Sequence, residues 1–119
     1  MYGFVFDVCG VEIDPNDSSI KIDKYITGHD AGKILNPLLA DGQIYGAYAH
    51  AVGASLLEEF RYAKDGSFLS GTFQDYLLPS SKEINQPDII HIETPSPFTP
   101  LGSKGLGEGN CMSTPVAIA

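Results

Sequence analysis

The sequence predicts an α+β chain in which strands, paired mainly antiparallel, pack against one long helix. Residues 4–13 and 20–27 alternate apolar and polar side chains with a period of two, which is typical of strands. Residues 36–60 form a run rich in alanine, leucine and glycine that opens on Asn-Pro, which is typical of a helix start. No internal repeat divides the chain, so we expect its 119 residues to form one domain or a fragment of one.

The composition excludes several classes of function. Fifteen acidic and seven basic residues give a net charge of −8, and no cluster of lysine and arginine is present that would bind a phosphate backbone. The chain has no run of eighteen apolar residues, and its first residues lack the pattern of a signal peptide. We therefore expect a cytoplasmic chain with neither a nucleic-acid nor a membrane partner.

The first element in chain order is a predicted β-hairpin. Phe4, Phe6 and Val8 alternate with less apolar positions, and this pattern continues to Ile13. Residues 15–18 read Pro-Asn-Asp-Ser, which favours a turn. Residues 20–27 then predict the antiparallel return strand.

A long helix is predicted next, from an Asn36 cap and Pro37 at the first helical position to about Phe60. Glycine inside a helix costs up to about 1 kcal/mol relative to alanine. Two explanations remain open: another element packs closely against the glycines, so that Gly46→Leu would destabilise the chain, or a cofactor lies on this face. The glycines are Gly42, Gly46 and Gly53.

Three further elements are predicted towards the C-terminus. Asp65-Gly66 between short apolar runs indicates a second hairpin. Residues 88–94 alternate again and predict another strand. A helix is expected to begin at Ser113 or Thr114, with Pro115 in its first turn.

The segment before that last helix is the candidate functional loop. Residues 99–110 read Thr-Pro-Leu-Gly-Ser-Lys-Gly-Leu-Gly-Glu-Gly-Asn and place one carboxylate, Glu108, between glycines. Residues without a Cβ let the backbone pass close to a bulky ligand. We therefore expect Glu108 to be buried against a ligand, and a solvated carboxylate on an irregular connection is the alternative.

The cysteines and histidines do not predict a metal site. Cys9 and Cys111 follow no paired spacing, so we expect free thiols. The three histidines, His29, His50 and His91, show no metal-binding spacing. A zinc site would require a convergence in space that the sequence does not predict.

The order Ser-Lys-Gly-Leu-Gly-Glu at residues 103–108 resembles the active-site loop of the xanthine dehydrogenase and aldehyde oxidase family, which are molybdenum hydroxylases. Other motifs follow the family's order. They are Val-Glu-Ile-Asp-Pro at 11–15, His-Asp-x-Gly-x-x-x-Asn-Pro at 29–37, Asp-Gly-Gln-x-x-Gly at 41–46 and Asp-Tyr-x-x-Pro at 75–79. The resemblance covers nearly the whole chain and implies a C-terminal part of the molybdopterin-binding subunit.

The resemblance also implies roles for individual residues. Glu108 would be the catalytic general base, and Gln43 would hydrogen-bond the pterin of the cofactor. Gly105 and Gly107 would lie against the cofactor, and no residue of the chain would bind the metal directly. His50 stands where the family usually has glutamine, so its role is open.

The implied function is the oxidation of a heterocycle or an aldehyde, with water as the oxygen source. Molybdenum-molybdopterin, in its plain or a dinucleotide form, would be shared with absent segments of the subunit, and FAD and 2Fe-2S would lie on partner subunits. Two alternatives stay open. The chain is short enough to be a non-catalytic structural or regulatory fragment, and its glycine-rich loop suits a phosphate- or nucleotide-binding module, although both standard nucleotide motifs are missing.

Overall fold

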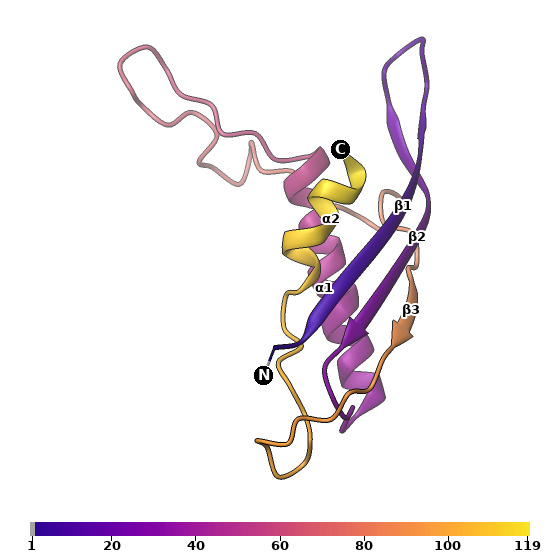
Figure 1. Ribbon diagram of the computed structural model, residues 1–119. Coiled ribbons are helices and arrows are strands. Elements are labelled where there is room, and N and C mark those ends of the chain that lie inside the picture. The colour runs from indigo at the N-terminus through magenta and orange to yellow at the C-terminus, as the bar shows by residue number, and fades with distance from the viewer. Residues whose placement is uncertain (1) are drawn as a thin grey trace.

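The computed structural model describes residues 2–119 and confirms the α+β class, with a three-stranded sheet and two helices (Figure 1). The sheet order is β1-β2-β3. The helix α2 lies beside α1 and against β1. In chain order the elements are β1 (Phe4–Ile13), β2 (Ile20–Asp30), α1 (Pro37–Leu56), β3 (Asp88–His91) and α2 (Asn110–Ile118).

The predicted first hairpin is confirmed. β1 and β2 pair antiparallel from Phe4 opposite Asp30 to Ile13 opposite Ile20. The register shifts between Gly10 and Val11, which marks a bulge in the hairpin. The return strand extends three residues beyond the predicted end and so reaches the His-Asp motif at 29–30.

The third strand confirms the expectation of a mainly antiparallel sheet only in part. β3 pairs parallel with β2, from Ile26 opposite Asp88 to His29 opposite His91. The sheet is therefore mixed. The physical reason is that α1 and the long connection after it form a crossover, which returns the chain to the same end of the sheet.

The second hairpin is reduced to a turn. Residues 61–70 form a single bridge between Tyr62 and Phe68 and no strands. The Ala63 carbonyl accepts from the Gly66 backbone N–H at 3.0 Å, and Gly66 has the positive φ of 86° that the turn requires. Figure 1 shows this segment projecting away from the sheet. An isolated hairpin that packs on no core buries little apolar surface, so its pairing is too weakly stabilised to extend into longer strands.

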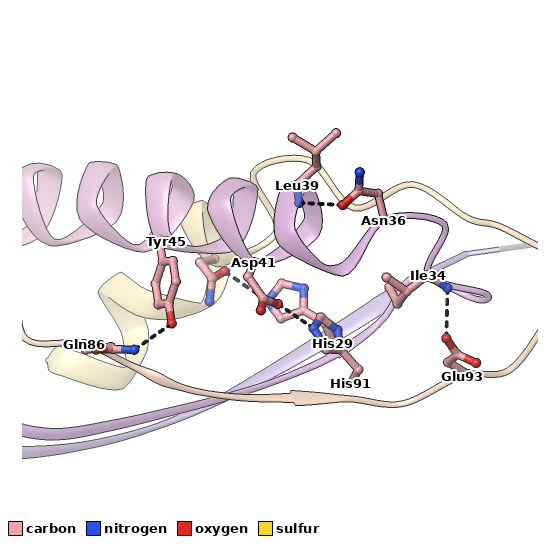
Figure 2. Close-up of polar contacts among 10 residues, drawn as sticks. His29, Ile34, Asn36, Leu39, Asp41, Tyr45, Gln86, His91 and Glu93 are labelled. Carbon is pink, nitrogen blue, oxygen red and sulfur yellow. Dashed lines mark hydrogen bonds and ion pairs between the residues drawn. The ribbon is translucent and has the colours of Figure 1, made fainter.

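Helix α1 begins as predicted and ends earlier. The Asn36 side chain accepts a hydrogen bond from the Leu39 N–H at 3.2 Å (Figure 2). The helix stops at Leu56, four residues before the predicted end. Glu58 and Glu59 follow, and the last turn carries no basic residue. Negative charges at a helix C-terminus oppose the helix dipole, so further turns there are disfavoured.

Helix α2 is the helix expected near the C-terminus, but it begins at Asn110, three residues earlier than Ser113. Pro115 therefore lies inside the helix, where its ring removes one helical hydrogen bond. Side-chain contacts offset this loss, because the Asn110 amide donates to Asp7 at 3.1 Å and to Thr27 at 2.9 Å.

The core lies between β2 and the two helices. Tyr25 and Tyr48 are fully buried, with ring centroids 4.3 Å apart, and the Tyr25 hydroxyl lies 2.6 Å from Thr114 Oγ1.

The radius of gyration is 17.0 Å, whereas a compact chain of this length has about 13.5 Å. Phe4 and Val8 on β1 stay 52% and 55% exposed. Apolar surface of this extent is typical of a face that packs against further protein.

The close packing expected at the helix glycines is wrong for two of the three. A Cβ added at Gly42 or Gly46 would meet no atom of residues 2–119 within 4 Å. Only Gly53 fits the expectation, since a Cβ there would lie 3.2 Å from Pro79 Cδ. The large penalty expected for Gly46→Leu within this chain is therefore withdrawn, and the alternative of a ligand on this face stands.

Gly46→Ala is expected to stabilise the chain by up to about 1 kcal/mol, because alanine has the higher helix propensity and its methyl group meets open space. Gly53→Ala is the matched control, and its methyl group would press on Pro79. The free energy of unfolding measured in urea checks both. A loss of stability for Gly46→Ala equal to that for Gly53→Ala would contradict an open face.

Candidate functional site

The loop that carries Glu108 is fastened to the end of β2 by backbone hydrogen bonds. The Gly102 carbonyl accepts from Lys33 N–H at 3.0 Å and from Ser96 N–H at 2.9 Å, and Gly102 has a φ of 72°. The Lys104 N–H donates to the Ala31 carbonyl at 2.7 Å. A left-handed φ suits glycine, so this residue type lets the loop turn back onto the strand.

A buried ion pair fixes the same loop from its side chains. Lys104 Nζ lies 2.8 Å from Asp30 Oδ2, and the two side chains are only 4% and 1% exposed. Lys104 also donates to Thr94 at 2.6 Å, and Thr94 donates to Asp30. Burial would raise the pKa of Asp30, but hydrogen bonds from Lys104, Thr94 and the Gly32 backbone outweigh it and hold the pKa below its usual range.

A second buried polar cluster orients the start of α2. Asn110 Oδ1 lies 3.0 Å from His29 Nε2, while the amide nitrogen donates to Asp7 and Thr27. Burial lowers the pKa of His29, which favours the neutral ring. Because Asn110 is two residues beyond Glu108, this cluster also limits where the carboxylate can lie.

The structure brings three of the four predicted site residues together. Gln43 is exposed on α1, and a Cβ built at Gly107 would lie 3.8 Å from Gln43 Nε2. Glu108 follows directly, with a positive φ of 48° and a side chain 69% exposed. Gly105 lines, with Gly107, a neighbouring cleft of about 300 Å³ beside Gly3. The burial expected for Glu108 is thus not provided by this chain.

Two residues without a predicted role complete the site. His50 Nδ1 lies 3.7 Å from Glu108 Oε1 and 3.7 Å from Cys111 Sγ. Burial raises the pKa of the Cys111 thiol, and the charge of Glu108 adds to the effect. The sequence could have indicated a role for His50 through its position. It follows Gln43 by seven residues, or about two helical turns, which places both side chains on one face of the helix. Nothing in the sequence alone indicated that Cys111 would join them.

The surface between these groups is open at Gly42 and Gly46, where a built Cβ would meet no atom of residues 2–119 within 4 Å. Gly42 and Gly46 flank Gln43 along the exposed face of α1, and neither carries a side chain that could cover the helix backbone. Lys104, although it is in the same loop, pairs with Asp30 and not with Glu108. Among the described residues, His50 is the basic side chain that contacts Glu108. We name this surface the α1 face: Gly42, Gln43, Gly46 and His50, with Gly107 and Glu108 at its edge.

The α1 face presents groups that can bind a polar ligand. A primary amide presents donors and an acceptor together at Gln43, a carboxylate can take up a proton at Glu108, and the glycines admit a bulky group to the helix surface.

Within residues 2–119 no helix is both long and apolar enough to span a bilayer.

Comparison with known proteins identifies relatives over the whole chain. The family model described as the molybdopterin cofactor-binding domain matches residues 1–85. The 6-hydroxypseudooxynicotine dehydrogenase complex subunit gamma of Paenarthrobacter nicotinovorans is 39% identical over 119 residues, which cover 99% of this chain and 15% of that protein. The nicotine 6-hydroxylase large subunit of the same organism is 38% identical, over 91% of this chain and 13% of its own length.

Solved structures agree with the sequence relatives. Quinoline 2-oxidoreductase from Pseudomonas putida 86 superposes with a TM-score of 0.88 at 38% identity, over 92% of this chain and 14% of that one. Reconstituted CO dehydrogenase from Oligotropha carboxidovorans gives a TM-score of 0.89 at 29% identity, over 98% and 14%. The chain therefore spans about one seventh of the length of these proteins.

Proposed function

Because the chain belongs to the molybdopterin cofactor-binding domain family, we propose that it forms part of the catalytic subunit of a molybdenum-dependent hydroxylase or dehydrogenase. The proposed reaction oxidises a heterocycle or an aldehyde, with water as the source of oxygen. The observation that carries the proposal is the α1 face, which presents Gln43 and the Glu108 loop side by side on an open, glycine-lined surface.

The residues of the α1 face fit the cofactor by their chemistry. Open space over Gly42 and Gly46 admits a flat ring system, and the exposed Gln43 amide is placed to hydrogen-bond its edge. Gly105 and Gly107 leave the loop backbone uncovered towards the adjoining cleft. Molybdenum-molybdopterin supplies the redox chemistry when it is bound.

In the proposed reaction, Glu108 accepts a proton at a carboxylate oxygen, and a general base of this kind contributes about 10²- to 10⁴-fold to the rate. The Asp30–Lys104 pair and the Asn110 cluster hold the loop that carries it. The 69% exposure of the side chain leaves room for the rest of the subunit to close over the site and exclude water.

We further propose that the remainder of the subunit completes the cofactor pocket, with FAD and 2Fe-2S on partner subunits. The printed names of the relatives support an assembly, since one is a complex subunit and another a large subunit. The exposed apolar residues of β1 offer a surface on which further protein can pack.

We expect the chain to hold stoichiometric molybdenum only together with the rest of the subunit, because it supplies one side of the pocket. Metal analysis and pterin fluorescence are measured on the chain alone and on the complex purified from the native host. Gln43→Ala should lower the molybdenum content of the complex, whereas Gln86→Ala, at another exposed amide, should not. Molybdenum bound to the chain alone would refute a shared pocket, and a complex without molybdenum would favour a non-catalytic fragment.

A further inference from the structure

The fold brings one nitrogen, one oxygen and one sulfur ligand together at the edge of the α1 face. His50 projects from α1, Glu108 from the loop before α2, and Cys111 from the first turn of α2. His50 Nδ1 is 3.7 Å from Glu108 Oε1 and 3.7 Å from Cys111 Sγ, and all three ligand atoms lie within 4.8 Å of one another.

These separations are close to those that a zinc ion requires. With bond lengths of about 2.0 to 2.3 Å in a tetrahedral site, neighbouring ligand atoms lie about 3.3 to 3.8 Å apart. Both separations from His50 already lie in this range, and the third, between Glu108 and Cys111, is no longer than 4.8 Å. A thiolate and an imidazole favour a borderline-soft metal over Mg²⁺ or Ca²⁺, which prefer oxygen ligands.

We propose that His50, Glu108 and Cys111 form a binding site for a single Zn²⁺ ion. Binding converts the Cys111 thiol to a thiolate and releases its proton to solvent. Three protein ligands leave a fourth tetrahedral position open, and the exposure of His50 and Glu108 turns that position towards solvent. The helices hold two of the three ligands, so the site requires little rearrangement of the backbone.

The site has a functional consequence, which rests on the proposed role of Glu108. A carboxylate that coordinates Zn²⁺ cannot accept a proton, so zinc would act as a reversible inhibitor at the base itself. Zinc binding, however, requires no molybdenum and no turnover. A binding measurement therefore tests the zinc site independently of the proposed enzyme function.

The test is equilibrium dialysis of the chain, in the form purified from its host, against micromolar Zn²⁺. We expect one Zn²⁺ per wild-type chain and a loss of affinity of at least about 10-fold in Cys111→Ser and in His50→Gln. Cys9→Ser is the matched control, because Cys9 is also a half-buried free thiol and lies outside the cluster. X-ray absorption should show a Zn–S bond of about 2.3 Å in the wild type and in Cys9→Ser.

Circular dichroism establishes that each variant is folded, and Cys111→Ala provides a second variant of small volume at the same position. Absence of saturable zinc binding by the wild type would overturn the proposal. So would equal binding by the folded Cys111 and His50 variants, or a wild-type absorption spectrum with no sulfur ligand. Loss of binding in Cys9→Ser alone would place the site elsewhere and would likewise overturn it.

Discussion

Glu108→Gln in the assembled enzyme is expected to lower turnover per molybdenum by about 10²- to 10⁴-fold, with the molybdenum content unchanged. Glutamine keeps the shape of the side chain and its hydrogen-bonding capacity, but it cannot take up the proton. Turnover at saturating substrate, normalised to molybdenum measured in the same sample, checks the expectation. Because the Glu108 side chain is largely exposed in this chain, we expect the substitution to disturb few other contacts.

Glu59→Gln is the matched control for this experiment. Its side chain is 76% exposed, lies 3.8 Å from Arg61 and is remote in sequence from the Glu108 loop. The control changes the net charge by the same amount and should leave turnover unchanged. Equal rates for wild type and Glu108→Gln would end the assignment of Glu108 as the base. Joint loss of molybdenum and activity would instead give Glu108 a structural role in holding the cofactor.

Lys104→Met should lower the melting temperature of the chain by at least about 10 °C, because it leaves a buried carboxylate without its cation. Methionine is similar in length and removes the charge without leaving a large void. Thermal unfolding followed by circular dichroism measures the change. We also expect the Glu108 loop to become more mobile, which hydrogen exchange at residues 102–109 would report.

Lys24→Met is the control for Lys104→Met. It removes an ion pair with Asp88 whose side chains are 59% and 58% exposed, and such pairs contribute little, so the melting temperature should fall by less than about 4 °C. Similar losses for the two variants would show that the Asp30–Lys104 pair has no special importance.

The pH dependence of stability provides a second test of the Asp30–Lys104 pair. The pKa of Asp30 is lower in the folded than in the unfolded chain, so its stabilising effect is complete above about pH 4 and is lost as the pH falls through the folded-state pKa. Removal of Lys104 takes away the largest of the interactions that lower the pKa of Asp30, so the folded chain favours the ionised carboxylate less. The difference in stability between wild type and Lys104→Met should therefore narrow as the pH is lowered from about 7 to about 3.

The elements predicted from sequence were those that depend on neighbouring residues. The turn at 15–18 fixed the first hairpin, and the Asn36 side chain capped α1 as its position indicated. The direction of β3, the start of α2 and the environment of Gly46 depend on contacts between distant segments. Local propensity therefore predicted these features wrongly. For example, the contacts of Asn110 place the start of α2 early enough that Pro115 lies inside the helix.

The same distinction between local and long-range information holds for the candidate site. Gln43 and Glu108 were identified by motifs that resemble a known family, and their catalytic and binding roles stay predictions. The fold adds what no motif contains, because His50 and Cys111 lie 61 residues apart in sequence and meet only when α2 packs beside α1. The Asp30–Lys104 pair, 74 residues apart, was missed for the same reason.

The hydrogen bonds of Asp7 have a consequence for the order of events during synthesis. This residue of β1 binds Asn110 and Thr114, across separations of 103 and 107 residues. Contacts between such distant positions form late, because the intervening chain must first be ordered. The hairpin and α1 can be structured while the chain is still being translated, but the Glu108 loop acquires its position only after α2 has been made. If the proposed function holds, cofactor insertion is expected to follow the synthesis of α2.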